Sequence, residues 1–528
     1  MSFKVLISDP LAEEGVEILR AFCDVDVKTG LSEDELVKII GDYDGLLVRS
    51  GTQVTARIIE AADKLKFIGR AGAGVDNIEM EPATKRGIIV ANAPAGNTLA
   101  ACEHTVAMMM SLVRNIPQAT ASVKKGEWKR SQFMGIEVNG KTLGIAGFGR
   151  IGQELSKRAN AMAMKVIAYD PYMNYKRAEE LGVTVVTLEE LFKMSDIITV
   201  HTPLIKETKH MINRETIATM KDGVRIINCA RGGIIDEDAL YDAIVSGKVA
   251  GAALDVYEEE PPKNSKIIEL PQVINTPHLG ASTVEAQKNV AVSVAEQCIE
   301  VLKGGSADFV VNAPIVAPDM QERIKPYAEI AQKMGKLISQ IVEGRITSVE
   351  IEYAGKAAEF GNGSKYITRV VVKGIMDTIL QTPANIVNAE FAATEHSIKI
   401  SESISPEAHG FANLITITLK TDKMTETISG NVLAPDKVRI VKIGDYMTDL
   451  TPSGSVIVSY HHDKPGVIGA FGTIAGKYGI NIAGMQVGRN NPGEDAVMVL
   501  NVDSEVPQNV MDEFLKIDGV KTAKYARI

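Results

Sequence analysis

A dinucleotide-binding pattern is formed by Gly147, Gly149, Gly152 and Asp170. Gly147 permits a tight turn, Gly149 lets the backbone approach a pyrophosphate, and Gly152 lets a helix pack closely on a strand. The first N–H groups of that helix and its positive dipole end favour phosphate. Asp170 lies about 20 residues on, where a carboxylate accepts hydrogen bonds from a ribose diol and repels a 2′-phosphate. The pattern therefore predicts NAD as cofactor rather than NADP.

Three residues further along the chain have the side chains that hydride transfer requires, namely a base for a hydroxyl proton and a cation for a carbonyl oxygen or carboxylate. They are Arg231 in NCARGG, Glu260 in EEEPP and His278 in TPHLGAST, each after a strand-like run. A guanidinium binds a carboxylate in a bidentate manner, and a carboxylate beside an imidazole favours its charged form. Two alternatives stay open, a structural histidine and a solvated acidic loop over residues 258–260.

The elements that position these residues alternate between strand and helix over the first three hundred residues, which predicts α/β folding with parallel sheets. Active sites of such sheets lie at the carboxyl ends of the strands. The strands are predicted at 5–8, 45–49, 67–70, 88–90, 143–146, 165–169, 183–186, 197–202, 224–229, 250–256 and 273–276. The helices are predicted at 12–22, 97–112 and 284–302.

From residue 314 the regular alternation of strand and helix patterns ends. Residues 313–318 have the composition of a linker, and a long helix is predicted at 327–342 with strand-like runs at 346–353, 414–420 and 438–443. Residues 453–528 have the order βαββαβ, which predicts a ferredoxin-like unit. The predicted fold class is thus α/β with two doubly wound Rossmann-like domains, then an α+β region and a ferredoxin-like unit.

The turn Gly72-Ala73-Gly74 follows a predicted strand but lacks the third glycine of a dinucleotide fingerprint. We interpret it as a concavity of backbone N–H groups suited to a carboxylate or phosphate, with a plain tight turn as the equal alternative. The segment from Lys124 to Arg130 is polar and carries the single tryptophan, Trp128.

The composition excludes several classes of function. With 528 residues the chain has room for three or four domains, and its net charge of −10 disfavours non-specific nucleic-acid binding. Its four cysteines are widely spaced and form no metal-ligand pattern, so no metal is expected. No signal pattern opens the sequence and no apolar run has the length of a membrane span, so we expect a cytoplasmic protein.

The motifs GFGRIG…YDP, HTPL, NCARGGIIDEDAL, AALDVYEEEPP and TPHLGAST resemble those of the D-isomer-specific 2-hydroxyacid dehydrogenases. With GRAGAGVDN, NAPAGNT and the C-terminal extension, the chain is similar to the longest members of that family. The resemblance implies a discontinuous substrate domain over 1–97 and 281–313 and an NAD domain over 98–280. It also implies an intervening domain over 314–452 and a regulatory ACT domain over 453–528.

The same resemblance implies residue roles. His278 is expected to be the acid/base, Glu260 its carboxylate partner and Arg231 the clamp on the substrate. Substrate contacts are expected from Arg49, Ser50, Arg70, Gly72, Ala73, Gly74 and, at a hinge, Asn97. Cofactor contacts are expected from Gly147, Gly149, Arg150, Ile151, Gly152, Asp170, Thr202, Cys229, Ala230, Asp255 and Gly280. Asp255 has a structural alternative as a loop anchor.

The ACT domain implies a small-molecule effector, L-serine, bound between two subunits by His461, Asp463 and Asn481. Many family members have Asn where Asp463 stands, which leaves the contact geometry open. The Trp128 segment is expected to approach a neighbouring subunit, so a homo-oligomer, dimer or tetramer, is implied. The alternative is a surface loop with a packed tryptophan.

The activity implied is NAD-dependent oxidation of 3-phospho-D-glycerate to 3-phosphohydroxypyruvate, the entry to serine biosynthesis, with allosteric feedback by serine. Two alternatives remain open. One is a related enzyme acting on glyoxylate, hydroxypyruvate or D-lactate, which the C-terminal extension and the pair Arg49/Arg70 disfavour. The other is a non-catalytic NAD-sensing regulator built on the same fold.

Overall fold

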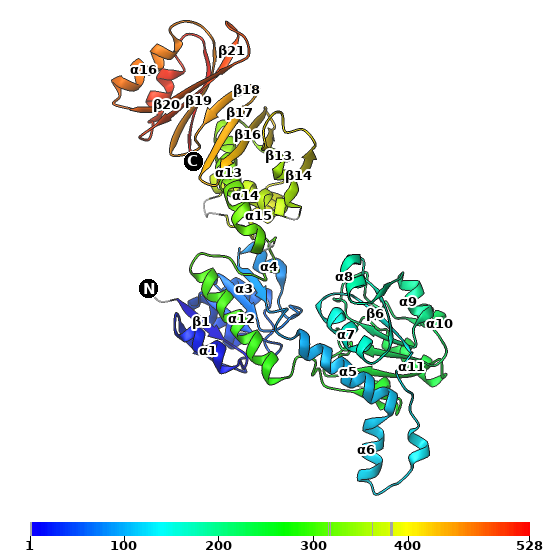
Figure 1. Cartoon of the computed structure of the whole chain (residues 1–528). Helices are drawn as coiled ribbons and strands as arrows, with labels where there is room; N and C mark the ends of the chain where they lie inside the picture. Colours follow the sequence, from blue (N-terminus) through cyan, green and yellow to red (C-terminus); the bar gives the residue numbers. More distant parts are fainter. Residues whose placement is uncertain (1–2, 264, 315, 317, 362, 381–383) are drawn as a thin grey trace.

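The structure is a computed structural model that describes residues 3–263, 265–314, 316, 318–361, 363–380 and 384–528. These residues form four sheets. The first sheet lies beside the second and is joined to it through the long helix α5, and the two C-terminal sheets lie above the first in this view (Figure 1). The described helices include none that is long and apolar enough to cross a membrane.

The first sheet is parallel, with the order β2-β1-β3-β4-β5. Its strands are β1 Lys4–Ile7, β2 Asp24–Val27, β3 Gly45–Val48, β4 Phe67–Arg70 and β5 Ile89–Asn92. Its helices are α1 Glu13–Arg20, α2 Glu33–Ile39, α3 Ala56–Ala61 and α4 Met80–Lys85, with the 3-10 turn η1 Ile40–Asp42. The later helix α12, Val284–Leu302, returns to this sheet and buries Val290, Val294 and Cys298 against its strands. The first sheet's domain is therefore discontinuous in sequence, while its expected boundaries and its expected role in substrate binding stay predictions.

The second sheet is parallel too, with the order β12-β11-β10-β9-β6-β7-β8. Its strands are β6 Thr142–Ala146, β7 Lys165–Tyr169, β8 Thr184–Val185, β9 Ile197–Val200, β10 Val224–Asn228, β11 Val249–Leu254 and β12 Val273–Asn275. Its helices are α5 Thr98–Arg114, α7 Arg150–Ala161, α8 Tyr175–Glu180, α9 Leu188–Met194, α10 Arg214–Thr219 and α11 Glu237–Val245, with the 3-10 turn η3 Lys266–Glu269. The strand order reverses at β6, between β7 and β9, and such a switch point opens a crevice for ligands. The predicted doubly wound α/β class is confirmed.

An arm projects from the second sheet's domain, built from α6, Ile116–Lys124, and the segment that returns through the 3-10 turn η2, Arg130–Phe133. Figure 1 shows α6 pointing away from the rest of the chain. The arm exposes large apolar side chains: Trp128 is 77% exposed and Met134 83% exposed. The tryptophan is thus not packed within its own chain, which removes the packed-loop alternative.

The third sheet is mixed, with the order β14-β13-β15-β16-β17-β18. Its strands are β13 Ile346–Gly355, β14 Lys399–Ser405, β15 Asn413–Thr421, β16 Thr425–Ala434, β17 Lys437–Ile443 and β18 Tyr446–Leu450. Its helices are α13 Pro318–Ile341, α14 Gly363–Ile379 and α15 Ala389–Glu395, with the 3-10 turn η4 Lys356–Phe360. The helix predicted at 327–342 begins nine residues earlier and contains Pro326. Of the linker predicted at 313–318, residues 315 and 317 lie outside the described residues.

The fourth sheet has the order β20-β21-β19-β22, which confirms the ferredoxin-like βαββαβ unit. Its elements are β19 Ser455–His462, α16 Val467–Lys477, β20 Ile482–Arg489, β21 Asp495–Val502, α17 Gln508–Phe514 and β22 Val520–Arg527. Helices α16 and α17 cover one face. The other face, which includes Val456, Val458 and Val499, shares one apolar core with α13 and the third sheet.

The third sheet's domain also contacts the first sheet's domain. The Asn385 side chain donates to the Gly87 carbonyl at 2.6 Å, and Lys85 in α4 pairs with Glu395 in α15 at 3.0 Å. Gly87 has φ +72°, and a side chain there would collide with the Asn385 amide. The C-terminal half is therefore attached close to β5, which follows Gly87.

Candidate active site

The glycine turn between β6 and α7 has the geometry that a pyrophosphate needs. Gly147 has φ +96°, in the region that favours glycine. A Cβ at Gly152 would lie 2.5 Å from the Gly147 carbonyl oxygen, so α7 packs directly on the turn. Around Gly149, in contrast, a Cβ would meet no protein atom within 4 Å. The chain's own packing thus does not require glycine at position 149, whereas close approach by a ligand does.

Asp170, at the end of β7, is half-buried and holds this turn in place. Its carboxylate accepts from the Phe148 backbone N–H at 2.8 Å and from the Tyr172 N–H at 2.8 Å. The carboxylate therefore lies beside the phosphate turn, as the fingerprint requires of the group that reads the ribose.

Other expected cofactor residues lie at the ends of β9 and β10. The Thr202 hydroxyl is buried and has no hydrogen-bond partner among the described residues. Burial, followed by the nearby charge of Asp255, raises the pKa of the Cys229 thiol to about 12. Cys229 therefore stays a neutral thiol, and its expected contact with the cofactor stays a prediction.

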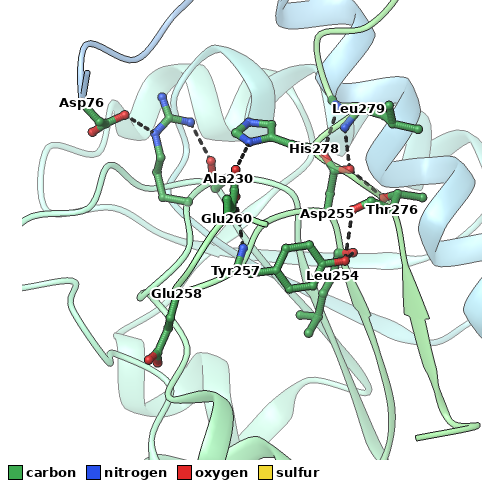
Figure 2. Close-up of polar contacts among 12 residues, drawn as sticks. Asp76, Ala230, Leu254, Asp255, Tyr257, Glu258, Glu260, Thr276, His278 and Leu279 are labelled. Atoms are coloured by element: carbon green, nitrogen blue, oxygen red, sulfur yellow. Dashed lines mark hydrogen bonds and ion pairs between the residues drawn. The ribbon is translucent and has the colours of Figure 1, made fainter. Parts of the chain in front are cut away.

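His278 and Glu260 form the hydrogen-bonded pair that acid/base chemistry requires, with Nδ1 2.7 Å from Oε2 (Figure 2). Glu260 Oε1 accepts from the Tyr257 N–H at 3.2 Å, which orients the carboxylate. Burial raises the pKa of Glu260, but the hydrogen bond and charge of His278 together with the Tyr257 N–H outweigh it, and the net shift of the pKa is downward. The pair leaves the Nε2 nitrogen of His278 for another partner.

In the acidic loop over residues 258–260, Glu258 and Glu260 have different partners. Glu258 turns the other way and lies 3.1 Å from His210 Nε2, outside the pair described above. The solvated-loop alternative thus describes Glu258 and not Glu260.

Asp255 anchors the loop that carries His278. The residue is fully buried, and its carboxylate accepts from the Leu279 N–H at 2.7 Å and the Gly280 N–H at 2.8 Å. The Thr276 hydroxyl donates to it at 2.6 Å, and His104 Nε2 lies 3.1 Å away. This supports the loop-anchor interpretation of Asp255.

The anchor has a physical purpose. His278 adopts φ +57°, a left-handed conformation that costs a non-glycine residue about 1–2 kcal/mol. The His278 N–H donates to the Asp255 carbonyl at 2.9 Å, and the next two N–H groups donate to its carboxylate. These bonds hold His278 in a conformation that orients it toward Glu260.

We predict that Asp255→Asn destabilises the second sheet's domain by about 2–4 kcal/mol, because one amide N–H would face a backbone N–H donor in a buried site. Burial raises the pKa of Asp255, and hydrogen bonds from His104, Thr276 and Leu279 lower it more. A depressed pKa contributes stability that is complete above the ordinary value of about 3.9 and is lost as the pH falls through the folded value. Urea unfolding at pH 7 and near pH 3 should therefore give a smaller difference between the two proteins in acid; an equal difference at both would contradict the assignment.

Arg231 is held from both domains. Its Nε donates to Asp76 at 3.0 Å and its Nη1 donates to the Ala230 carbonyl at 2.6 Å (Figure 2). Its Nη2 lies where a side chain on Gly74 would be, and Arg70 Nη1 lies where one on Gly72 would be. Of the N–H groups in the turn, that of Gly72 already donates to the Arg70 carbonyl at 2.8 Å, and the interpretation of the turn as an anion-binding concavity stays a prediction. The glycines make room for two guanidinium groups.

A cleft of about 450 Å³ brings the substrate candidates of one domain to the catalytic pair of the other. The expected site residues that line it are Arg49, Ser50, Arg70, Gly72, Glu260 and His278. Burial, then the charge of Arg231, lowers the pKa of Arg70 to about 10, so the group is still a cation at neutral pH. The cleft thus joins cations to an acid/base pair. Asn97 lies just before α5 with a buried side-chain oxygen that has no partner among the described residues.

The three effector candidates do not lie together within one chain. His461 and Asp463 are at the end of β19, where His462 pairs with Asp495, whereas Asn481 precedes β20 at the opposite end of the sheet. Asp463 accepts from Arg489 at 2.6 Å, and the Asn481 amide donates to Asp503 at 2.6 Å. A ligand contacting both ends requires a second subunit.

Sequence reasoning missed several residues around the cleft. His104 contacts Asp255 from α5, and Asp76 contacts Arg231. Phe309 lies 5.4 Å from the guanidinium of Arg150 and links the returning segment to the glycine turn. Only Asp76 gave a signal, as the acid two residues after Gly74.

Comparison with known proteins identifies the same regions. Residues 106–280 match the NAD-binding domain model of the D-isomer specific 2-hydroxyacid dehydrogenases. Residues 323–444 match the D-3-phosphoglycerate dehydrogenase intervening domain, and 455–519 match the ACT domain. Among solved structures, the D-lactate dehydrogenase of Aquifex aeolicus complexed with NAD and lactic acid has a TM-score of 0.52 and 30% identity. That match covers 57% of this chain and 96% of the other.

The fold and the site thus define an NAD-binding D-isomer-specific 2-hydroxyacid dehydrogenase. Full-length relatives narrow the class. The D-3-phosphoglycerate dehydrogenase of Methanocaldococcus jannaschii is 46% identical and covers 98% of each chain. That of Bacillus subtilis is 44% identical and covers 99% of each. The chain belongs to the D-3-phosphoglycerate dehydrogenase family.

Proposed function

We propose that the protein oxidises 3-phospho-D-glycerate to 3-phosphohydroxypyruvate with NAD, as the first step of L-serine biosynthesis. The observation that carries this proposal is the 2.7 Å His278–Glu260 pair in a cleft lined by Arg49 and Arg70. Arg49 and Arg70 beside an acid/base pair suit the phosphate of the substrate, and Arg231 suits its carboxylate. The full-length relatives with the corresponding name support the same substrate.

Each residue of the cleft has a separate role in this reaction. Nδ1 of His278 is held by Glu260, so Nε2 takes the C2 hydroxyl proton, and the Glu260 carboxylate stabilises the imidazolium that forms. Arg231 binds the carboxylate and the developing carbonyl oxygen, and Arg49 and Arg70 bind the phosphate. Bound NAD would supply the acceptor for the hydride that leaves C2.

One assay tests the proposal, namely NADH formation followed by absorbance with 3-phospho-D-glycerate. Glyoxylate, hydroxypyruvate and D-lactate serve as competing substrates of the related enzymes. We expect phosphoglycerate to be preferred, because the unphosphorylated acids leave Arg49 and Arg70 without a phosphate. Preference for an unphosphorylated acid would favour a related dehydrogenase, and no turnover with any acid would favour the NAD-sensing regulator.

Cofactor preference gives a separate prediction at Asp170. Asp170→Ala should lower kcat/KM for NAD about 10- to 100-fold, the cost of charged hydrogen bonds to the ribose, and should raise activity with NADP. Asp170→Asn is the matched control: it keeps an acceptor for the Phe148 N–H and loses the charge that repels a 2′-phosphate. Unchanged kcat/KM for both cofactors in the alanine variant would exclude this role.

We also propose that the enzyme is a homo-oligomer, a dimer or tetramer, and that L-serine inhibits it by binding between ACT domains. The exposed Trp128 and Met134 on the arm support a subunit contact. The separation of Asp463 from Asn481 supports a serine site shared by two chains. Adding L-serine to the phosphoglycerate assay, with glycine as the control, tests the effector. The cytoplasmic location expected from the sequence stays a prediction.

A further inference from the structure

The substrate clamp Arg231 belongs to one domain but takes its orientation from both. It follows β10 of the second sheet, and within that domain its Nη1 donates to the Ala230 carbonyl at 2.6 Å. Asp76 follows β4 of the first sheet and accepts from Nε at 3.0 Å. Gly74, from the same turn as Asp76, leaves the space that Nη2 occupies. Two nitrogens of the guanidinium thus have hydrogen-bond partners, one in the second sheet's domain and one in the first sheet's domain.

The charges around the cleft single out Asp76. Arg49, Arg70 and Arg231 supply three cations, and Asp9 and Asp76 are the carboxylates that act on Arg70. Asp9 is committed locally, since its Oδ2 accepts from the Arg49 N–H at 2.6 Å and the Thr52 N–H at 3.0 Å. The side chain of Asp76 is 69% exposed and forms an ion pair with Arg231. It is therefore available to act on the clamp without supporting the core.

We propose that Asp76 is a positioning residue that sets the orientation of Arg231 for the substrate carboxylate. A guanidinium has five N–H groups in a rigid fork. Asp76 accepts from Nε–H and the Ala230 carbonyl accepts from one N–H of Nη1. The other N–H of Nη1 and the N–H of Nη2 beside it then form the free end of the fork. That end is what a carboxylate binds in a bidentate manner. The inference rests on the proposed function, which supplies the carboxylate.

This arrangement links recognition to the width of the cleft. Asp76 and Gly74 move with the first sheet's domain and Arg231 moves with the second. If the domains part, Nε loses its partner and the guanidinium is free to rotate about the bonds of a side chain that has many rotamers. The guanidinium of Arg231 is thus oriented only when the two domains are close enough to bring Arg70 near His278. We therefore expect the enzyme with an open cleft to bind the substrate carboxylate poorly.

The test compares Asp76→Ala with Asp76→Asn by steady-state kinetics on the full-length enzyme. We expect the alanine variant to lose about tenfold in kcat/KM for phosphoglycerate, as for loss of one charge-assisted hydrogen bond, while KM for NAD stays within twofold. The asparagine variant should keep at least one third of the wild-type value, because its amide oxygen still accepts from Nε. Both variants remove the same negative charge, so higher activity of the asparagine variant than of the alanine variant reports the orientation of Arg231 and not the charge.

Asp63→Ala is the matched control. Asp63 is an exposed carboxylate of the same domain that pairs with Arg86 at 3.5 Å. It lies before β4, at the amino end of the strand, whereas the cleft lies at the carboxyl end. Its loss changes the net charge equally and should leave kcat/KM within twofold. The proposal is overturned if Asp76→Ala stays within twofold of wild type, if it exceeds wild type, or if alanine and asparagine lose activity equally.

A second measurement separates this inference from the proposed function. Calorimetry of 3-phosphoglycerate binding to the enzyme–NADH complex requires no turnover. If the wild-type enzyme binds the acid but makes no NADH, the proposed function fails and the positioning role is judged by binding alone. Asp76→Ala should then weaken binding about tenfold and Asp76→Asn by less than threefold; unchanged binding in the alanine variant, or no binding by the wild type, overturns the role.

Discussion

Replacement of His278 by alanine should lower kcat for phosphoglycerate oxidation by at least about 10²-fold, the lower bound for a lost general base. The reason is geometric, since the Glu260 carboxylate fixes Nδ1 at 2.7 Å and leaves Nε2 as the acceptor for the hydroxyl proton. The KM for NAD should change little, because the glycine turn and Asp170 lie elsewhere on the sheet. Stopped-flow measurement of the first turnover would show the loss in the chemical step itself.

The chain offers a matched control in His210. This histidine also lies beside a carboxylate, Glu258, at 3.1 Å, and is similarly exposed, but it does not line the cleft. His210→Ala should keep wild-type kcat. If His278→Ala turned over at the wild-type rate, or if both alanine variants lost the same factor, the assignment of the base would be wrong.

Arg231→Ala should reduce kcat/KM for phosphoglycerate by about 10²- to 10³-fold, the cost of removing a donor that stabilises developing charge. Arg231→Lys should recover only a small part of this, because an ammonium is a point charge and lacks the planar fork. The lysine would also lose at least one of the contacts to Asp76 and the Ala230 carbonyl, which involve two nitrogens of the guanidinium.

Arg214 provides the comparison for this prediction. It is an exposed arginine of the same domain that pairs with Asp242 at 2.5 Å, on the surface of α10 and α11. Arg214→Ala should leave kcat/KM within twofold. Full activity of Arg231→Lys would mean that charge alone matters at this position, and the bidentate clamp would have to be abandoned.

The sequence predicted the parts of the fold that depend on local pattern. Predicted strands at 67–70 and 165–169 and the helix at 284–302 have the observed bounds, because buried parallel strands are short apolar runs and a long amphipathic helix repeats every 3.6 residues. The glycine fingerprint carried its own context of strand, turn, helix and acid, and that context was enough to locate the nucleotide site.

Other features depended on contacts that no local pattern encodes. β2 and α2 were missed, since β2 is half-exposed and reads DVDV. The early start of α13 was missed because Pro318 and Pro326 usually mark breaks, although Pro is tolerated at a helix's first turn. The roles of Asp255 and Gly74 follow from residues more than 20 positions away, the loop that carries His278 and the guanidinium of Arg231. The role of Gly72 follows from the way the Arg70 side chain folds back over the turn.

The core shared by the third and fourth sheets has a consequence for engineering. Shortening the gene at residue 452 would strip Val456, Val458 and Val499 from α13 and bare an apolar surface that costs about 25 cal/mol for each Å². A minimal catalytic chain should instead stop ahead of α13. By the same reasoning the two C-terminal domains move as one body. A change in their orientation therefore reaches the catalytic half through contacts such as the hydrogen bond from Asn385 to the Gly87 carbonyl.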